Sequence, residues 1–148
     1  MRFIQIFHRG WDHHTILPKQ LPGQCFDVDQ PCAALLADLK QRGLLDDTIV
    51  VFTTDHGTHL GELGYVQKQP ALLNSLLMHL PLFIRHPDRS TAGRRVGELV
   101  SAIDFAPTFC HMLGIDDQEQ MDGRNAWPLA TGKAEGLNDR VFTKFNPF

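Results

Sequence analysis

Short apolar runs separated by polar, turn-forming residues dominate the pattern of hydrophobic and polar positions. These runs are rich in β-branched and aromatic residues, are too short for helices, and therefore predict strands. The run 49–52 has no polar position, which is typical of a strand buried on both faces in a mostly parallel sheet. The predicted strands are 3–7, 48–54, 82–84, 99–103 and, at an edge, 141–145.

Helical periodicity is clearest over residues 30–42. Asp29 is a good N-cap, and Gly43 is placed to end the helix. Leucines at helical spacing predict its buried stripe: Leu35, Leu36 and Leu39. Residues 15–24 contain two prolines and a glycine, so they are predicted to form a loop.

Two further helices follow the strands. Leucine spacing indicates a helix over residues 70–80, and residues 104–113 form a second one, with Asp104 as N-cap and Gly114 just past its end. Residues 88–95 are polar and are expected in an exposed turn. Strands that alternate with helices predict the α/β class, and 148 residues suit a single domain, residues 1–148.

Asp55 and His56 come directly after strand 48–54, and Gly57 follows them. Open α/β sheets place their ligands at the carboxyl ends of strands. A carboxylate and an imidazole at that position predict a divalent-metal site. The alternative is structural: Asp55 caps a following helix while His56 packs in the core.

Several segments beyond this pair resemble the sulfatase family of the alkaline phosphatase superfamily. The resemblance covers about residues 44–148, and it implies a partial alkaline-phosphatase-like α/β/α sandwich with a mostly parallel sheet, and hydrolysis of sulfate or phosphate esters. The segments are Asp55-His56-Gly57-Thr-His59-Leu-Gly61-Glu-Leu-Gly64, Lys68, Leu80-Pro81-Leu-Phe-Ile-Arg85-His-Pro87, Leu99-Val-Ser101-Ala-Ile-Asp104-Phe-Ala-Pro107-Thr108 and Met121-Asp122-Gly123-Arg124-Asn-Ala-Trp-Pro128.

The resemblance also implies roles for individual residues. Asp55 and His56 bind one metal, whereas Lys68 and His59 contact the anionic oxygens of the substrate as catalytic residues. Asp12 and His14 resemble the first-metal ligands of two-metal phosphatases. The structural alternatives are a solvated lysine on a loop and a polar segment at a strand end. Histidine beside the aspartate resembles the phosphonate and phosphodiester branch, and imidazole suits manganese or zinc better than calcium.

The nucleophile of a sulfatase stands in a C/S-x-P-x-R motif, which is found nowhere in this sequence. Residues 1–47 instead resemble a secreted bacterial sulfatase-like family without a settled activity. We therefore expect a truncated sulfatase-family hydrolase that carries the metal- and anion-binding half of a site. A two-metal phosphoesterase, which needs no side-chain nucleophile, and a non-catalytic metal- or anion-binding module are the alternatives.

Charge and composition indicate which classes of binding partner are expected. The formal net charge is −3 and no basic block stands out, which argues against nucleic acid and leaves a small anionic ester as the expected substrate. The absence of a long apolar stretch predicts no membrane span, and no signal peptide is evident. A core strand this close to residue 1 indicates a preceding segment. The location is therefore cytoplasmic by default, or secreted or periplasmic if such a segment exists.

Overall fold

The structure is a computed structural model that describes residues 4–6, 21–65, 67, 72–115 and 120–143. Its strands are β1 (Ile4–Ile6), β2 (Val50–Thr53), β3 (Leu82–Arg85) and β4 (Arg95–Val96), and its α-helices are α1 (Leu21–Gln41), α2 (Ser75–Met78), α3 (Phe105–Met112) and α4 (Trp127–Thr131). Within the described ranges, no helix is both long and apolar enough to cross a membrane.

The strands form one sheet in the order β2-β3-β1-β4. β3 is antiparallel to both β1 and β2, and β1 is parallel to β4. The prediction of a mostly parallel sheet is therefore wrong for the described strands. The connection from β2 to β3 is long enough for a parallel crossover, but its described residues contain a 3-10 turn, Glu62–Gly64, and the short α2, and β3 pairs antiparallel with β2.

β1 and β2 nevertheless run in the same direction, because each is antiparallel to β3. Ile6 at the end of β1 and Thr53 at the end of β2 both pair with Leu82. The C-terminal ends of β1 and β2 therefore lie at the same end of the sheet.

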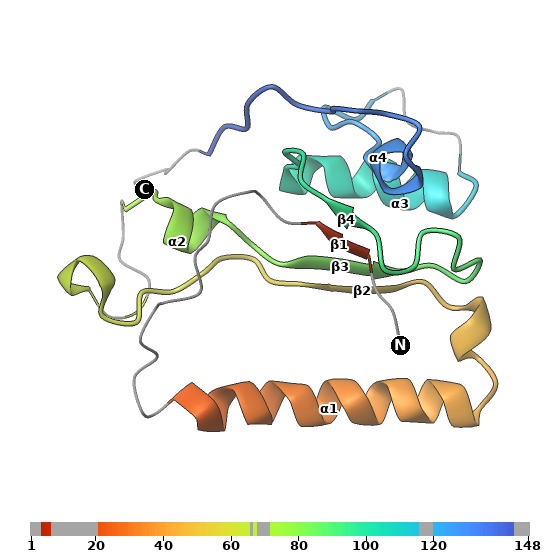
Figure 1. Cartoon of the computed structure of the whole chain (residues 1–148), viewed down its shortest axis with the longest axis horizontal. Coiled ribbons are helices and arrows are strands. Elements are labelled where there is room, and N and C mark those ends of the chain that lie inside the picture. Colours follow the sequence, from red (N-terminus) through yellow and green to blue (C-terminus); the bar gives the residue numbers. More distant parts are fainter. Residues whose placement is uncertain (1–3, 7–20, 66, 68–71, 116–119, 144–148) are drawn as a thin grey trace.

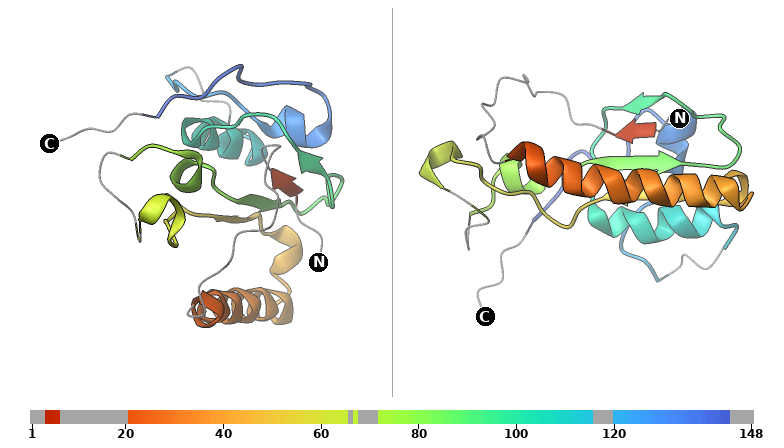
Figure 2. Two further views of the ribbon diagram at one scale, coloured as in Figure 1. Left: turned by 60° about the vertical axis from the view of Figure 1, so that its left-hand side comes forward. Right: turned by 90° about the horizontal axis from the view of Figure 1, so that it is seen from below.

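Helices lie on both sides of the sheet. α3 and α4 lie on one side and α1 lies on the other, as Figures 1 and 2 show. This arrangement confirms the α/β class and is consistent with part of an α/β/α sandwich.

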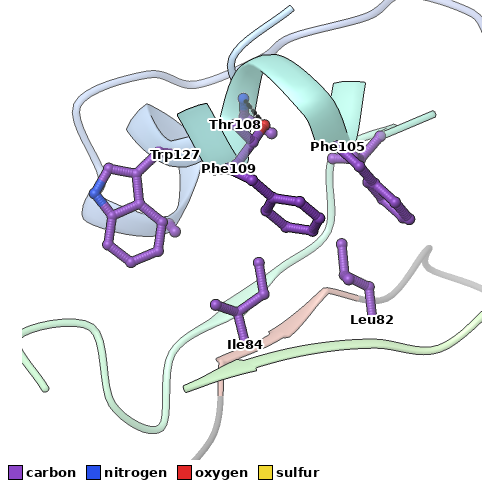
Figure 3. A pocket seen from close by; sticks show the side chains of 9 residues that line it. Leu82, Ile84, Phe105, Thr108, Phe109 and Trp127 are labelled. Atoms are coloured by element: carbon purple, nitrogen blue, oxygen red, sulfur yellow. Dashed lines mark hydrogen bonds between the residues drawn. The ribbon is translucent and has the colours of Figure 1, made fainter. Parts of the chain in front are cut away.

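The main core fills the space between the sheet and the α3–α4 side. Its buried members come from β3, β4, α4 and the residue before α4: Leu82, Ile84, Val96, Ala126, Trp127, Leu129 and Ala130. Phe105 and Phe109 of α3 point toward Leu82 and Ile84 around a small apolar cavity (Figure 3). The cavity measures about 10 Å³, which is at the limit for one water molecule.

α1 begins well before its predicted start. Residues 21–24, expected in a loop, already belong to the helix, and Pro31 lies inside it. Inside a helix a proline lacks the backbone N–H for one hydrogen bond, and its ring crowds the carbonyl four residues earlier, so Pro31 weakens α1 near its middle. Gly43, at φ +70°, follows the helix as predicted. The predicted stripe is wrong for Leu35, which is 56% exposed, and Leu36 and Leu39 are only half-buried.

Other predicted elements differ more. The predicted helix 70–80 is reduced to α2. The predicted exposed turn 88–95 is confirmed over most of its length, except that Thr91 is buried and Arg95 begins β4. Residues 99–103 do not form the predicted strand. Ala102 and Ile103 belong to a 3-10 turn, Ala102–Asp104, and Leu99 forms an isolated β-bridge with Asn138. Residues 141–143 form no strand either, and 144–145 lie outside the described residues. α3 is confirmed, with Gly114 at φ +71° past its end.

Candidate metal site

Asp55 and His56 lie just past the C-terminal end of β2. The strand itself is not buried on both faces, because β2 is at one end of the sheet order and Phe52 is 41% exposed. The predicted position at a strand end is therefore right, but the predicted central strand is wrong. This edge position leaves both side chains open to solvent: Asp55 is 84% exposed and His56 is 36% exposed.

The imidazole of His56 is oriented by its own backbone neighbour. Its Nδ1 lies 2.7 Å from the carbonyl oxygen of Gly57. A carbonyl oxygen only accepts, so Nδ1 carries the proton, and in the neutral ring Nε2 presents a lone pair. That Nε2 lies 3.6 Å from Oδ2 of Asp55. Two electron-pair donors therefore face each other at the strand end.

The pair fits a divalent cation by chemistry and by distance. Metal–ligand distances of roughly 2.0–2.6 Å allow one ion to touch two atoms 3.6 Å apart. Oδ1 of Asp55 accepts the backbone N–H of His56 at 2.9 Å, which leaves Oδ2 free for a ligand. Slight desolvation acts to raise the pKa of Asp55, but the positive charge that His56 carries when its ring is protonated, together with this hydrogen bond, holds that pKa below its ordinary value. The carboxylate is thus kept in its metal-binding form.

Gly57 fixes the direction in which the chain leaves the pair. Its N–H donates to the carbonyl oxygen of Leu77 at 2.8 Å. A Cβ at this position would come within 2.0 Å of the carbonyl oxygen of Leu76. Glycine is needed here because two backbones approach closely, and this close packing joins the Asp–His segment to α2.

His59 is in a different environment from the pair. Its side chain is fully buried at 0% exposure. Its Nδ1 lies 3.0 Å from the carbonyl oxygen of Gln67, and its Nε2 lies 3.0 Å from the side-chain nitrogen of Asn74. Both ring nitrogens are therefore occupied by protein groups, which does not favour the predicted contact with a substrate.

Three other predicted site residues, Lys68, Asp12 and His14, lie outside the described residues. Among the residues that are described, no group of three or more His, Cys, Asp and Glu side chains comes together to hold a metal. Asp55 and His56 therefore supply two ligands of the candidate site. Asn74, which contacts His59 across 15 residues of sequence, was not predicted, because no local pattern marks it.

Family models divide the chain in two. Residues 61–148, more than half of the chain, match the model described as N-sulphoglucosamine sulphohydrolase, C-terminal. Residues 1–62 match a family described as a protein of unknown function, DUF1501. The order of the two parts agrees with the two resemblances seen in the sequence, but the boundary differs. Residues 48–60, which include Asp55 and His56 and were expected in the sulfatase-like part, fall within the match to DUF1501.

Individual relatives are sulfatases. The chain is 36% identical over 112 residues to the extracellular sulfatase SULF-1 homolog of Drosophila melanogaster, covering 76% of this chain and 10% of the relative. It is 34% identical over 102 residues to the N-acetylglucosamine-6-O-sulfatase of Bacteroides thetaiotaomicron, covering 69% of this chain and 18% of the relative. The chain thus spans less than a fifth of the length of either protein.

The solved structures similar to this chain indicate the same family. The phosphonate monoester hydrolase of Agrobacterium radiobacter matches with a TM-score of 0.67 at 33% identity, over 76% of this chain and 22% of that chain. A protein solved in complex with its substrate D-glucosamine-2-N,6-O-disulfate matches with a TM-score of 0.68 at 30% identity, over 78% of this chain and 23% of that chain. The chain therefore belongs to the sulfatase family of the alkaline phosphatase superfamily.

Proposed function

We propose that this chain carries the metal- and anion-binding half of a sulfatase-type ester hydrolase site, in which Asp55 and His56 hold one divalent cation. The observation that carries the proposal is the 3.6 Å approach of the His56 Nε2 lone pair to Oδ2 of Asp55. Two such groups gain from a positive charge placed between them. A bound cation would polarise an oxygen of the substrate ester.

Manganese, zinc and calcium are the candidate ions. Imidazole is a good ligand for manganese or zinc, whereas calcium prefers oxygen ligands alone. The exposure of Asp55 leaves room for the anionic oxygens of a substrate beside the ion. Lys68 is proposed as a further contact to those oxygens. Asp12 and His14 are proposed as additional ligands, because β1 and β2 end at the same sheet edge.

The chain holds no residue in the sequence context of a sulfatase nucleophile. Cys25, Cys32 and Cys110 all lack the C-x-P-x-R surroundings, and no serine has them. Charge stabilisation without a positioned attacking group gives little rate. We therefore propose that these 148 residues alone hydrolyse sulfate esters negligibly.

A second candidate is hydrolysis of phosphate or phosphonate esters. The similarity to phosphonate monoester hydrolases, at 33% and 34% identity, favours it, and such esters suit a site with two cations and no side-chain nucleophile. A non-catalytic metal- or anion-binding module is the remaining alternative.

The test is an aryl sulfate, an aryl phosphate and an aryl phosphonate assayed side by side with manganese, zinc or calcium added. The main proposal predicts metal binding with negligible sulfate turnover. Phosphate or phosphonate turnover that falls with Asp55→Ala would support the second candidate, whereas metal binding without turnover of any ester is expected of both the half-site and the binding module. Sulfate turnover that survives replacement of all three cysteines but falls with Asp55→Ala would contradict the nucleophile assignment.

A further inference from the structure

Two contacts attach the segment after the Asp–His pair to the chain around α2. The N–H of Gly57 donates to the carbonyl oxygen of Leu77 at 2.8 Å. Two residues later, His59 meets Asn74, the residue before α2, with 3.0 Å between Nε2 of the imidazole and the side-chain nitrogen of the amide. The direction in which the chain leaves His56 is thus set by its fit against residues 74–77.

The hydrogen bonds of His59 fix its tautomer. Nδ1 faces the carbonyl oxygen of Gln67, which only accepts, so Nδ1 carries the proton. In the neutral ring Nε2 is then an acceptor, and the amide group of Asn74 donates to it. The backbone N–H of Gln67 also donates to the carbonyl oxygen of His59 at 2.9 Å. His59 therefore closes the loop 59–67 at its base and joins that base to Asn74.

The packing around His59 explains why a buried histidine is kept at this position. The ring of Tyr65 lies over it, with 5.8 Å between the ring centroids, and no part of the side chain reaches solvent. A buried imidazole with both nitrogens satisfied is rigid, because moving it would leave at least two polar groups without partners. Such a residue has no free atom for a substrate, but it holds its neighbours in place.

We propose that His59 is a positioning residue, which locks the segment 57–67 to Asn74 and thereby fixes the geometry of the Asp55–His56 pair. The inference rests on the proposed function in so far as that pair binds a cation. Groups that orient metal ligands through hydrogen bonds typically change metal affinity by about 10–100-fold when they are lost. His59 lies three positions after His56 and acts through the backbone, so we expect a change of about tenfold.

The first experiment measures the affinity of the full chain for manganese by titration calorimetry, at a temperature well below unfolding. The variants are His59→Ala, Asn74→Ala and the double variant, and the matched control is Thr108→Val. Thr108 is also buried, at 4% exposure, and also makes two hydrogen bonds, to the carbonyl oxygen of Asp104 and from the N–H of Ala126, but it lies in the α3–α4 core.

The expected result separates positioning from general stability. His59→Ala should bind manganese about tenfold more weakly, whereas Thr108→Val should lose thermal stability and keep its affinity. If the two side chains act as one lock, the double variant binds as weakly as His59→Ala alone. An unchanged affinity in His59→Ala, or fold-losses that multiply in the double variant, would overturn the inference.

A second measurement does not depend on the metal. Hydrogen exchange of the backbone amides should be faster at Gly57 and Gln67 in His59→Ala than in the parent, and unchanged there in Thr108→Val. If the parent binds none of manganese, zinc and calcium but exchange at Gly57 accelerates in His59→Ala, the proposed function fails and the lock remains. If exchange at Gly57 does not change, the lock is refuted whatever the parent binds.

Discussion

The backbone N–H of Arg124 donates a 2.8 Å hydrogen bond to Oδ1 of Asp104. Asp104 is buried at 1% exposure, and its other carboxylate oxygen accepts the N–H of Ser101 and the side-chain amide of Asn138, each at 2.8 Å. One carboxylate thus joins three segments that are distant in sequence. Asp104 stands directly before α3, as predicted for an N-cap, but its side chain makes no cap hydrogen bond to that helix and binds these other segments instead.

Replacing Asp104 with Ala should destabilise the protein strongly, because three donors would lose their acceptor. We expect a loss of about 3–5 kcal/mol in the free energy of unfolding, measured by urea denaturation. Asp139→Ala, at an exposed position, is the control and should change little. A loss below about 0.5 kcal/mol for Asp104→Ala, the range of ordinary surface substitutions, would contradict this account.

Gly57→Ala should disturb both stability and the metal site. The new Cβ would collide with the carbonyl oxygen of Leu76, and the hydrogen bond from the N–H of residue 57 to Leu77 would have to move. We expect a loss of about 2 kcal/mol or more in the free energy of unfolding and weaker manganese binding. Gly136→Ala is the matched control, since a Cβ there meets nothing within 4 Å. Equal stability of the two variants would show that the close approach at Gly57 is not maintained in solution.

The turn before β2 gives a prediction of pH dependence. Arg85 is buried, and it donates to the backbone carbonyls of Leu45 and Thr48 and to the carboxylate of Asp46, which Arg89 also contacts. The hydrogen bond and charge of Arg89, together with Arg85, hold the pKa of Asp46 below its ordinary value.

A carboxyl group whose pKa is lowered in the folded state stabilises the protein at pH values above the ordinary pKa of aspartate. This stabilisation is lost as the pH falls through the pKa of the folded state. Asp46→Asn should therefore be less stable than the parent at neutral pH, and the difference should shrink below about pH 4. The effect should be small and should weaken in high salt, because Asp46 is mostly exposed. A difference that grows on acidification has the wrong sign for this interaction.

The local pattern of apolar and polar residues was enough to predict those elements that depend on neighbouring residues alone. The apolar runs at β2 and β3 and the capped periodicity of α3 are of this kind. The order of the sheet could not be predicted, because it depends on how β3 enters between β1 and β2, over long sequence separations. The predicted strand 99–103 is wrong for the same reason, because Asp104, at the end of a 3-10 turn, is held by partners as distant as Asn138.

The candidate site shows the same limit. Asp55 and His56 are adjacent in sequence, so their chemistry could be predicted directly from the motif. The burial of His59 and its contact with Asn74 could not be predicted in this way, because they depend on residues distant in sequence. In a polar segment with several glycines, the sequence does not show whether a given side chain points outward to a substrate or inward to the protein.

The central claim, that Asp55 and His56 bind one divalent cation, is tested most directly by thermal unfolding with and without manganese, zinc or calcium. At a metal concentration about a hundred times the Kd, binding should stabilise the parent by about 2.7 kcal/mol and raise Tm by about 5–10 °C. Asp55→Ala should lose this gain, whereas the exposed control Asp139→Ala should retain it. Equal gains in Tm for the parent and Asp55→Ala with all three metals would contradict the site.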